Sequence, residues 1–146
     1  PATRPGNASR FARLPDGREF GAGTLAVLRT PGHTPDAICL LDRAHGLLFT
    51  GDTYYPAPIW LYRPETNLHD YVASVKRLAA LAPQLKLVLG EHNVPFAEPS
   101  VLPRLVTAIE TVRAGKVSPE PQDAGKAIYR YDGISFLLRA HALQGK

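Results

Sequence analysis

Residues 28–55 have the sequence LRTPGHTPDAICLLDRAHGLLFTGDTYY. Two apolar runs, AICLL and GLLF, flank the segment RAHG, which predicts two strands joined by a short hairpin loop. Neither run alternates apolar with polar residues, so we expect both faces of these strands to be buried, as under a covering layer of helices. His33 lies in the Pro-Gly loop before the hairpin, and Asp52 directly follows its second strand.

A helix and a further strand are predicted after this hairpin. The segment NLHDYVASVKRLAALAP, residues 67–83, has a one-sided apolar pattern, and Asn67 is a suitable N-cap. The segment LKLVLG, residues 85–90, predicts a strand. Because strand–helix–strand connections favour a parallel pair with a right-handed crossover, we expect this strand to pair with the second hairpin strand.

Three metal-competent side chains are expected at one edge of the resulting sheet. Asp52 and His92 follow the two parallel strands, and His33 also follows a strand. Ligand sites gather beyond the carboxyl ends of strands in such sheets. Taken singly, His33 is also explained as a structural histidine, Asp52 as a turn residue and His92 as part of a polar loop, so the hypothesis depends on their convergence.

The rest of the chain is predicted as one α/β domain. Its segments are an irregular lead-in (1–18), a strand near 24–30, a second helix (100–116) capped by Ser100, a linker (116–126) and a hairpin (127–138) through Asp132 and Gly133.

Composition narrows the function classes. The 146 residues are 45% hydrophobic and 21% charged, which is typical of one globular domain. The net charge of +4 is scattered and is not interleaved with aromatic residues, so nucleic acid is a disfavoured partner. No apolar run approaches the roughly 20 residues of a membrane helix, so no membrane partner is expected. The single cysteine, Cys39, allows no intrachain disulfide and is predicted to be a buried core residue.

The segments TPGHTPDAICLLD, LLFTGDTYY and LVLGEHN resemble the metallo-β-lactamase superfamily. The closing YRYDGISFLL resembles that family's last strands. The general hydrolase branch, with thioesterases, glyoxalase II-like enzymes and lactonases, is more similar than the true β-lactamases, which usually have cysteine where Asp52 stands. One departure is Glu91, because the family usually has glycine before the histidine that corresponds to His92.

The resemblance implies half of an αββα sandwich with metals at one edge. His33 would complete the site of the first metal, Asp52 would bridge two metals as a catalytic residue, and His92 would bind the second. Zinc is the expected metal, two per complete domain, with iron or manganese as alternatives. Metal binding lowers the pKa of a coordinated water to about 7, which would supply hydroxide to attack an ester, thioester, lactone or amide carbonyl.

Substrate contacts are expected from residues next to the ligands. Tyr54 and Tyr55 follow Asp52, so one of them should face the site, and Asn93 follows His92. The aromatic segment IWLYRP, residues 59–64, is interpreted as a loop that forms either a packed lid or a substrate wall. The expected substrate is a small acyl compound.

The family's His-x-His-x-Asp-His signature does not occur in this chain. Its histidines are His33, His45, His69, His92 and His141, and no two are two residues apart. The chain therefore resembles the C-terminal part of the fold, and it begins at Pro1 without any methionine. The upstream half is either absent from this chain, a separate partner chain, or lost in a non-catalytic relative.

The parent protein is thus predicted to be a metal-dependent hydrolase, and this chain alone is expected to be inactive. A phosphodiesterase or nuclease on the same scaffold, and a non-catalytic binding half-domain, remain the alternatives. The sequence does not identify the compartment, although a cytoplasmic location is favoured slightly over a periplasmic or secreted one.

Overall fold

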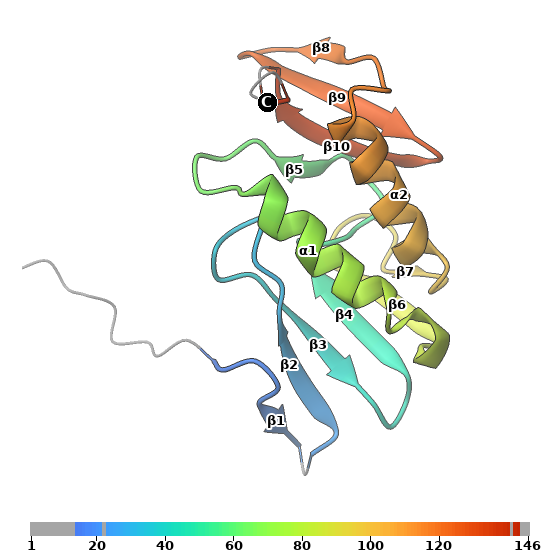
Figure 1. Ribbon diagram of the computed structural model, residues 1–146. Coiled ribbons are helices and arrows are strands. Elements are labelled where there is room, and N and C mark those ends of the chain that lie inside the picture. The colour runs from blue at the N-terminus through green and yellow to red at the C-terminus, as the bar shows by residue number, and fades with distance from the viewer. Residues whose placement is uncertain (1–13, 22, 141, 144–146) are drawn as a thin grey trace, which may run out of the picture.

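The computed structural model describes residues 14–21, 23–140 and 142–143 (Figure 1). It confirms the predicted α/β class, with two sheets and two α-helices in the described residues. The strands are β1 (Glu19–Phe20), β2 (Leu25–Arg29), β3 (Ile38–Asp42), β4 (Leu47–Gly51), β5 (Ile59–Leu61), β6 (Leu87–Gly90), β7 (Phe96–Ala97), β8 (Glu120–Gln122), β9 (Lys126–Tyr131) and β10 (Ile134–Arg139). The helices are α1 (Leu68–Ala79), α2 (Val101–Arg113) and the short 3₁₀ helix η1 (Ala82–Gln84). Neither α-helix is long and apolar enough to cross a membrane.

The larger sheet has the order β1-β2-β3-β4-β6-β7. Strands β4 and β6 are parallel, with Leu48 opposite Val88, which confirms the predicted strand–helix–strand unit through α1. Because β2, β3 and β4 are successively antiparallel, β2 runs in the same direction as β4. The carboxyl ends of β2, β4 and β6 therefore lie at one edge of this sheet.

The inner face of the larger sheet is buried against α1. Its residues are at most 5% exposed: Ala26, Leu28, Cys39, Leu41, Leu48 and Val88. They form one hydrophobic cluster with Tyr71, Val75 and Leu78 of α1, which Figure 1 shows running across this face. The predicted cap of α1 is confirmed, because the Asn67 side chain accepts hydrogen bonds from the backbone N–H groups of His69 and Asp70 at 2.9 and 3.1 Å.

The outer face of the larger sheet, which we define as Val27, Ile38, Leu40, Phe49, Leu89 and Phe96, is apolar and only partly covered, because Val27 is 0% exposed while other members of the face are not buried. The strand register places Leu40 beside Phe49, Phe49 beside Leu89, and Leu89 beside Phe96. Ile38 is 38% exposed, Phe49 39% and Phe96 58%. The prediction that both hairpin strands are buried on both faces is therefore wrong for the described residues. The reason is that α1 covers the inner face alone.

The smaller sheet has the order β5-β10-β9-β8, and α2 packs against β9 and β10. The predicted hairpin through Asp132 and Gly133 is confirmed, and both turn residues have positive φ. Two loop predictions are wrong. The segment with Trp60 forms β5, which pairs in parallel with β10, and residues 116–126, predicted as a linker, contain the edge strand β8. Ser100 occupies the N-cap position of α2 but makes no side-chain capping bond.

Candidate metal centre

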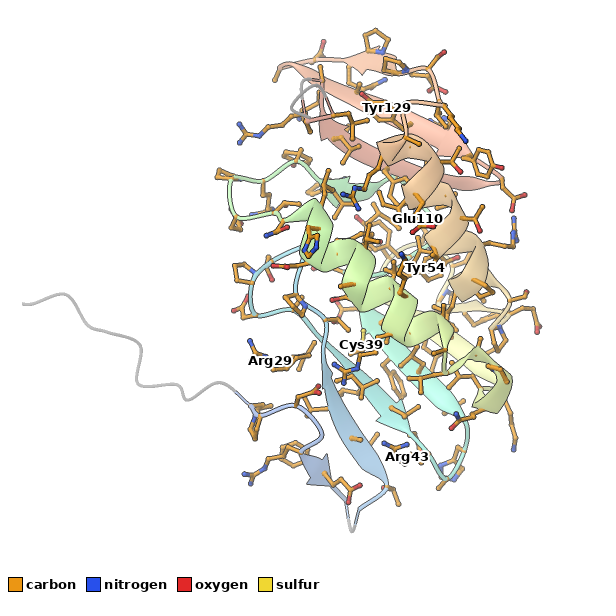
Figure 2. All side chains as sticks on the ribbon, viewed as in Figure 1. Arg29, Cys39, Arg43, Tyr54, Glu110 and Tyr129 are labelled. Carbon is orange, nitrogen blue, oxygen red and sulfur yellow. The ribbon has the colours of Figure 1, made fainter. Side chains whose placement is uncertain are left out.

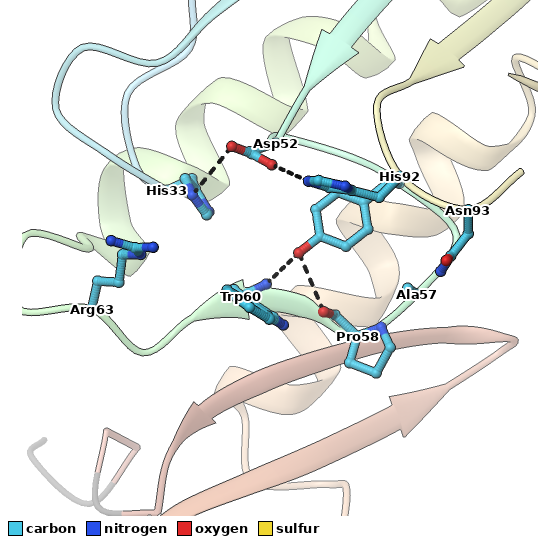
Figure 3. A pocket seen from close by; sticks show the side chains of 9 residues that line it. His33, Asp52, Ala57, Pro58, Trp60, Arg63, His92 and Asn93 are labelled. Carbon is cyan, nitrogen blue, oxygen red and sulfur yellow. Dashed lines mark hydrogen bonds and ion pairs between the residues drawn. The ribbon is translucent and has the colours of Figure 1, made fainter. Parts of the chain in front are cut away.

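The three predicted ligands converge at the carboxyl edge of the larger sheet. His33 follows β2, Asp52 follows β4 and His92 follows β6. The Asp52 carboxylate lies between the two imidazoles, with Oδ1 3.0 Å from His92 Nε2 and Oδ2 3.7 Å from His33 Nε2 (Figure 3). The structure therefore brings together three side chains that are far apart in the sequence, as the topology predicted.

The loop that carries His33 is fixed by its contact with the start of α1. Gly32 has a φ of +141°, and a Cβ there would lie only 2.3 Å from Tyr71 Cα, so any other residue would clash with the helix backbone. The Gly32 carbonyl accepts a hydrogen bond from Asn67 N–H at 2.9 Å. The Thr66 hydroxyl donates to the His33 carbonyl at 3.0 Å. These contacts hold the backbone of His33 in place.

The turn that carries Asp52 packs closely against the end of β6. The Thr50 hydroxyl donates to the Tyr54 carbonyl at 2.8 Å, which closes the turn around Asp52. A Cβ on Gly90 would lie 2.9 Å from that same carbonyl oxygen. Gly90 therefore permits the close approach of the two loops that carry Asp52 and His92.

A cavity of about 400 Å³ opens at these ligands. Its lining residues are His33, Asp52, Tyr55, Ala57, Pro58, Trp60, Arg63, His92 and Asn93. The Tyr55 hydroxyl accepts a hydrogen bond from Trp60 N–H at 3.0 Å and donates to the Pro58 carbonyl at 3.3 Å. Its ring meets His92 edge-on at 4.8 Å between centroids, so Tyr55 is a fixed wall of the cavity.

The two tyrosines after Asp52 have different positions. Tyr55 lines the cavity, as does Asn93, in agreement with their predicted proximity to the ligands. Both tyrosines are 5% exposed and belong to the hydrophobic core, but Tyr54 does not line this cavity. Figure 2 labels Tyr54 near α1 and α2. Its burial raises the pKa of its phenol. Tyr55 is therefore the one of the two tyrosines that faces this cavity, Tyr54 is not, and the substrate roles predicted for Tyr54, Tyr55 and Asn93 stay predictions.

The donor set fits a divalent metal ion. His33 is 7% exposed, and in the described part of the chain its Nδ1 has no hydrogen-bond partner. Its Nε2 is too far from Asp52 for a hydrogen bond. A buried polar group without a partner costs about 1–3 kcal/mol. Imidazole nitrogen and carboxylate oxygen are both ligands of zinc, so His33 Nε2 and the Asp52 carboxylate suit a metal ion between them, whereas Nδ1 would keep its lack of a partner among the described residues.

Glu91 is a further acidic residue at this edge. One donor atom each from Asp52, Glu91 and His92 lie within 4.8 Å of one another. The sequence showed Glu91 only as a departure from a family motif and did not indicate a ligand. Its position directly before His92, in a loop after a parallel strand, was the available signal.

The remaining candidates lie outside the centre. His45 is exposed and bonded to Asp42, and the His69 side chain is 84% exposed. His141 lies outside the described residues. Cys39 is confirmed as a core residue, and burial raises the pKa of its thiol to about 11, which excludes a thiolate nucleophile at neutral pH.

The fold and the site together define an α/β protein with a cluster of histidine and aspartate side chains, a candidate metal centre, at the carboxyl edge of a sheet. In a comparison with models of protein-family sequences, the metallo-beta-lactamase superfamily matches residues 4–92 of the chain. The chain therefore belongs to the metallo-β-lactamase superfamily, which confirms the resemblance found in the sequence.

Two relatives of the chain have the same name. The chain is 37% identical over 101 residues to "Acyl-coenzyme A thioesterase MBLAC2" of Gallus gallus, a match that covers 67% of this chain and 35% of the relative. The protein of that name from Homo sapiens is 36% identical over 90 residues, covering 58% of this chain and 32% of the relative. The chain thus spans about a third of the length of these relatives.

Two solved structures support the fold. The metallo-beta-lactamase family protein TTHA1429 from Thermus thermophilus has a TM-score of 0.59 at 24% identity, covering 73% of this chain and 38% of that one. TTHA1623, described in a di-iron-bound form, has a TM-score of 0.54 at 27% identity, covering 62% of this chain and 44% of that one.

Proposed function

We propose that the complete protein is a metal-dependent hydrolase of acyl compounds, and that a thioester of coenzyme A is its first candidate substrate. The observation that carries the proposal is the Asp52 carboxylate between His33 and His92 at the end of a cavity. The name of the relatives supports the thioester among the ester, thioester, lactone and amide substrates considered.

In this proposal His33, Asp52 and His92 hold the metal. A bound divalent cation lowers the pKa of a coordinated water and polarises the acyl carbonyl. Zinc is the first candidate, and the di-iron form of TTHA1623 supports iron beside manganese as an alternative. Asp52 offers one carboxylate oxygen toward each imidazole, which suits a bridge between two cations.

The walls of the cavity suit an acyl substrate. Ala57, Pro58 and Trp60 form an apolar side against which an acyl chain packs, and Trp60 is 45% exposed. Arg63 lies on the same cavity and offers its guanidinium to an anionic part of the substrate (Figure 3). Tyr55 forms the wall that contacts the substrate beside His92, and Asn93 orients the reacting group there.

Further residues are proposed to complete the site. Three ligands do not hold two metals, and the His-x-His-x-Asp-His spacing does not occur in this chain. The outer face of the larger sheet is apolar and half exposed, as expected for a surface that packs on another layer. We therefore expect an upstream half, in the same protein or as a second chain, to supply the remaining ligands. Residues 1–146 alone are expected to be inactive and to bind at most one zinc weakly.

The test is Asp52→Asn in the full-length protein. The amide keeps the shape of the side chain but removes the negative charge that offsets the cations, so we expect kcat to fall by about 10²-fold or more, with a loss of bound metal. Asp123→Asn, at an exposed aspartate between β8 and β9, is the matched control. Hydrolysis of a coenzyme A thioester and metal content are measured together.

Three outcomes contradict the proposal in different ways. Unchanged metal content with near-normal turnover of Asp52→Asn would show that Asp52 is a structural turn residue. Hydrolysis of a phosphodiester without hydrolysis of the thioester would favour the phosphodiesterase or nuclease alternative. A metal-loaded protein without turnover of either substrate would favour a non-catalytic relative.

A further inference from the structure

We propose that Glu91 is an additional metal ligand, which joins Asp52 and His92 and gives this metal position two carboxylates and one imidazole. This inference rests on the proposed function, because it concerns the same metal centre. It starts from the three donor atoms of Asp52, Glu91 and His92, which lie within 4.8 Å of one another.

The strand register places Glu91 beside Asp52. Gly51 at the end of β4 pairs with Gly90 at the end of β6, so Asp52 and Glu91 are the residues that follow two paired positions. A Cβ built on Gly51 would lie 3.9 Å from Glu91 Oε1. The Glu91 carboxylate therefore extends across the end of the sheet toward the loop that carries Asp52.

A cation would also compensate the negative charges at this edge of the sheet. Asp52 forms ion pairs with the two histidines alone, and Glu91 forms no hydrogen bond or ion pair within the part of the chain that the structure describes. Two carboxylates this close repel each other, and a cation between them removes the repulsion. No lysine or arginine in the described residues takes that role.

His33 supplies an independent indication of a ligand at the same place. It is 7% exposed, its Nδ1 has no partner among the described residues, and its Nε2 faces the Asp52 carboxylate from the side opposite His92 (Figure 3). The nearly buried imidazole makes no side-chain hydrogen bond among the described residues, and Nε2 is the ring nitrogen that faces this carboxylate, 3.7 Å from Asp52 Oδ2. The cluster is therefore more than a group of exposed acidic residues.

An extra carboxylate changes the preference of the site among metals. Carboxylate oxygens suit manganese and other hard cations, whereas imidazole suits zinc and iron. With Glu91 as a ligand, this chain supplies more oxygen donors than nitrogen donors to the position shared by Asp52 and His92. We expect Glu91 to raise the affinity for manganese(II) more than the affinity for zinc(II).

The experiment compares Glu91→Gln with wild type in the full-length protein. The metal-free proteins are titrated with manganese(II), followed by the paramagnetic resonance signal of the free ion, and with zinc(II) in competition with a chelator. Loss of a residue that only orients a ligand costs about 10–100-fold in metal affinity, so loss of a ligand itself should weaken manganese(II) binding at one position by about tenfold or more. Glu98→Gln, at another glutamate in the connection between β6 and α2, should bind both metals as wild type does.

Two further variants keep the inference separable from the proposed function. Glu91→Gly removes the carboxylate without adding a polar group and should reproduce the loss, with circular dichroism confirming that each variant is folded. Unchanged manganese(II) affinity in Glu91→Gln and Glu91→Gly would overturn the inference. If Asp52→Asn loses metal while both Glu91 variants keep it, only the role of Glu91 is wrong. If Asp52→Asn also keeps its metal, the proposed function itself fails.

Discussion

The two faces of the larger sheet are built from the same strands and have different surroundings. Leu48 and Phe49 are neighbours on β4, yet Leu48 is fully buried under α1 and Phe49 is 39% exposed on the outer face. Both faces are apolar, so composition does not explain the difference. What differs is the covering layer, because α1 packs on one side of the sheet only.

The comparison indicates that the outer face is suited to a partner layer. Phe49, Leu89 and Phe96 follow one another across three strands in register, which gives a continuous apolar strip. Contiguous apolar surface of this kind marks a packing interface. Phe49 and Leu89 each lie three residues before a candidate ligand, Asp52 and His92, so a layer that covers the outer face is well placed to contribute further metal ligands.

Leu48→Ala should have the largest effect on stability. Leu48 is 0% exposed and lies between α1 and the sheet, and deletion of a buried leucine side chain typically costs about 2–5 kcal/mol through lost burial and the cavity left behind. We expect the free energy of unfolding to fall by about 3 kcal/mol, measured by urea denaturation of the full-length protein. A cost below about 1 kcal/mol would mean that the inner face is not the main core.

Phe96→Ala distinguishes a covered outer face from an exposed one. In residues 1–146 alone, Phe96 is 58% exposed, so we expect a cost below about 1 kcal/mol. In the full-length protein a covering layer would raise the cost to about 2 kcal/mol, less than for a fully buried phenylalanine because β7 is an edge strand. Equal costs in the two proteins would show that no layer covers this face.

The same comparison can be made without a substitution. If the outer face needs a partner, residues 1–146 alone should self-associate or unfold with low cooperativity. Sedimentation and thermal melting measure both properties. A monomeric chain with a cooperative and reversible melt would contradict the need for a covering layer.

Much of the larger sheet was predictable because its signals are local. The hairpin of β3 and β4, helix α1 and strand β6 each have a continuous apolar pattern and clear boundaries, and the strand–helix–strand order fixes a parallel pair. His33, Asp52 and His92 were found because each follows one of these strands. Burial on both faces was inferred from the same apolar pattern, which does not show whether the second layer is supplied by the chain itself.

Two of the missed features depend on contacts distant in sequence, and the third, β8, has a composition that is atypical of a strand. Strand β5 pairs with β10, so Ile59 lies beside Phe136, and no pattern within IWL indicates that partner. Strand β8 is exposed throughout and contains Pro121, which is typical of a linker and is tolerated only because β8 is an edge strand. The approach of Glu91 to Asp52 follows from the Gly51–Gly90 register, which the sequence does not show.

Asp16→Asn should have the smallest effect on stability. It tests an exposed ion pair at the rim of the inner face, where α1 meets the segment before β1. Asp16 accepts two hydrogen bonds from the Arg77 guanidinium of α1, at 2.7 and 2.8 Å, and a third from Arg29 N–H at 2.7 Å. Both side chains of this ion pair are more than 40% exposed, so solvent screening limits its contribution to about 0.5 kcal/mol.

The hydrogen bond from Arg77 lowers the pKa of Asp16 below its ordinary value. The stabilisation is therefore present above the unfolded pKa of about 4 and is lost as the pH falls through the lowered folded pKa. Urea denaturation of wild type and Asp16→Asn should differ at pH 7 and converge in acid, and a pH-independent difference of about 2 kcal/mol would mean that this rim contact contributes as much as the buried core.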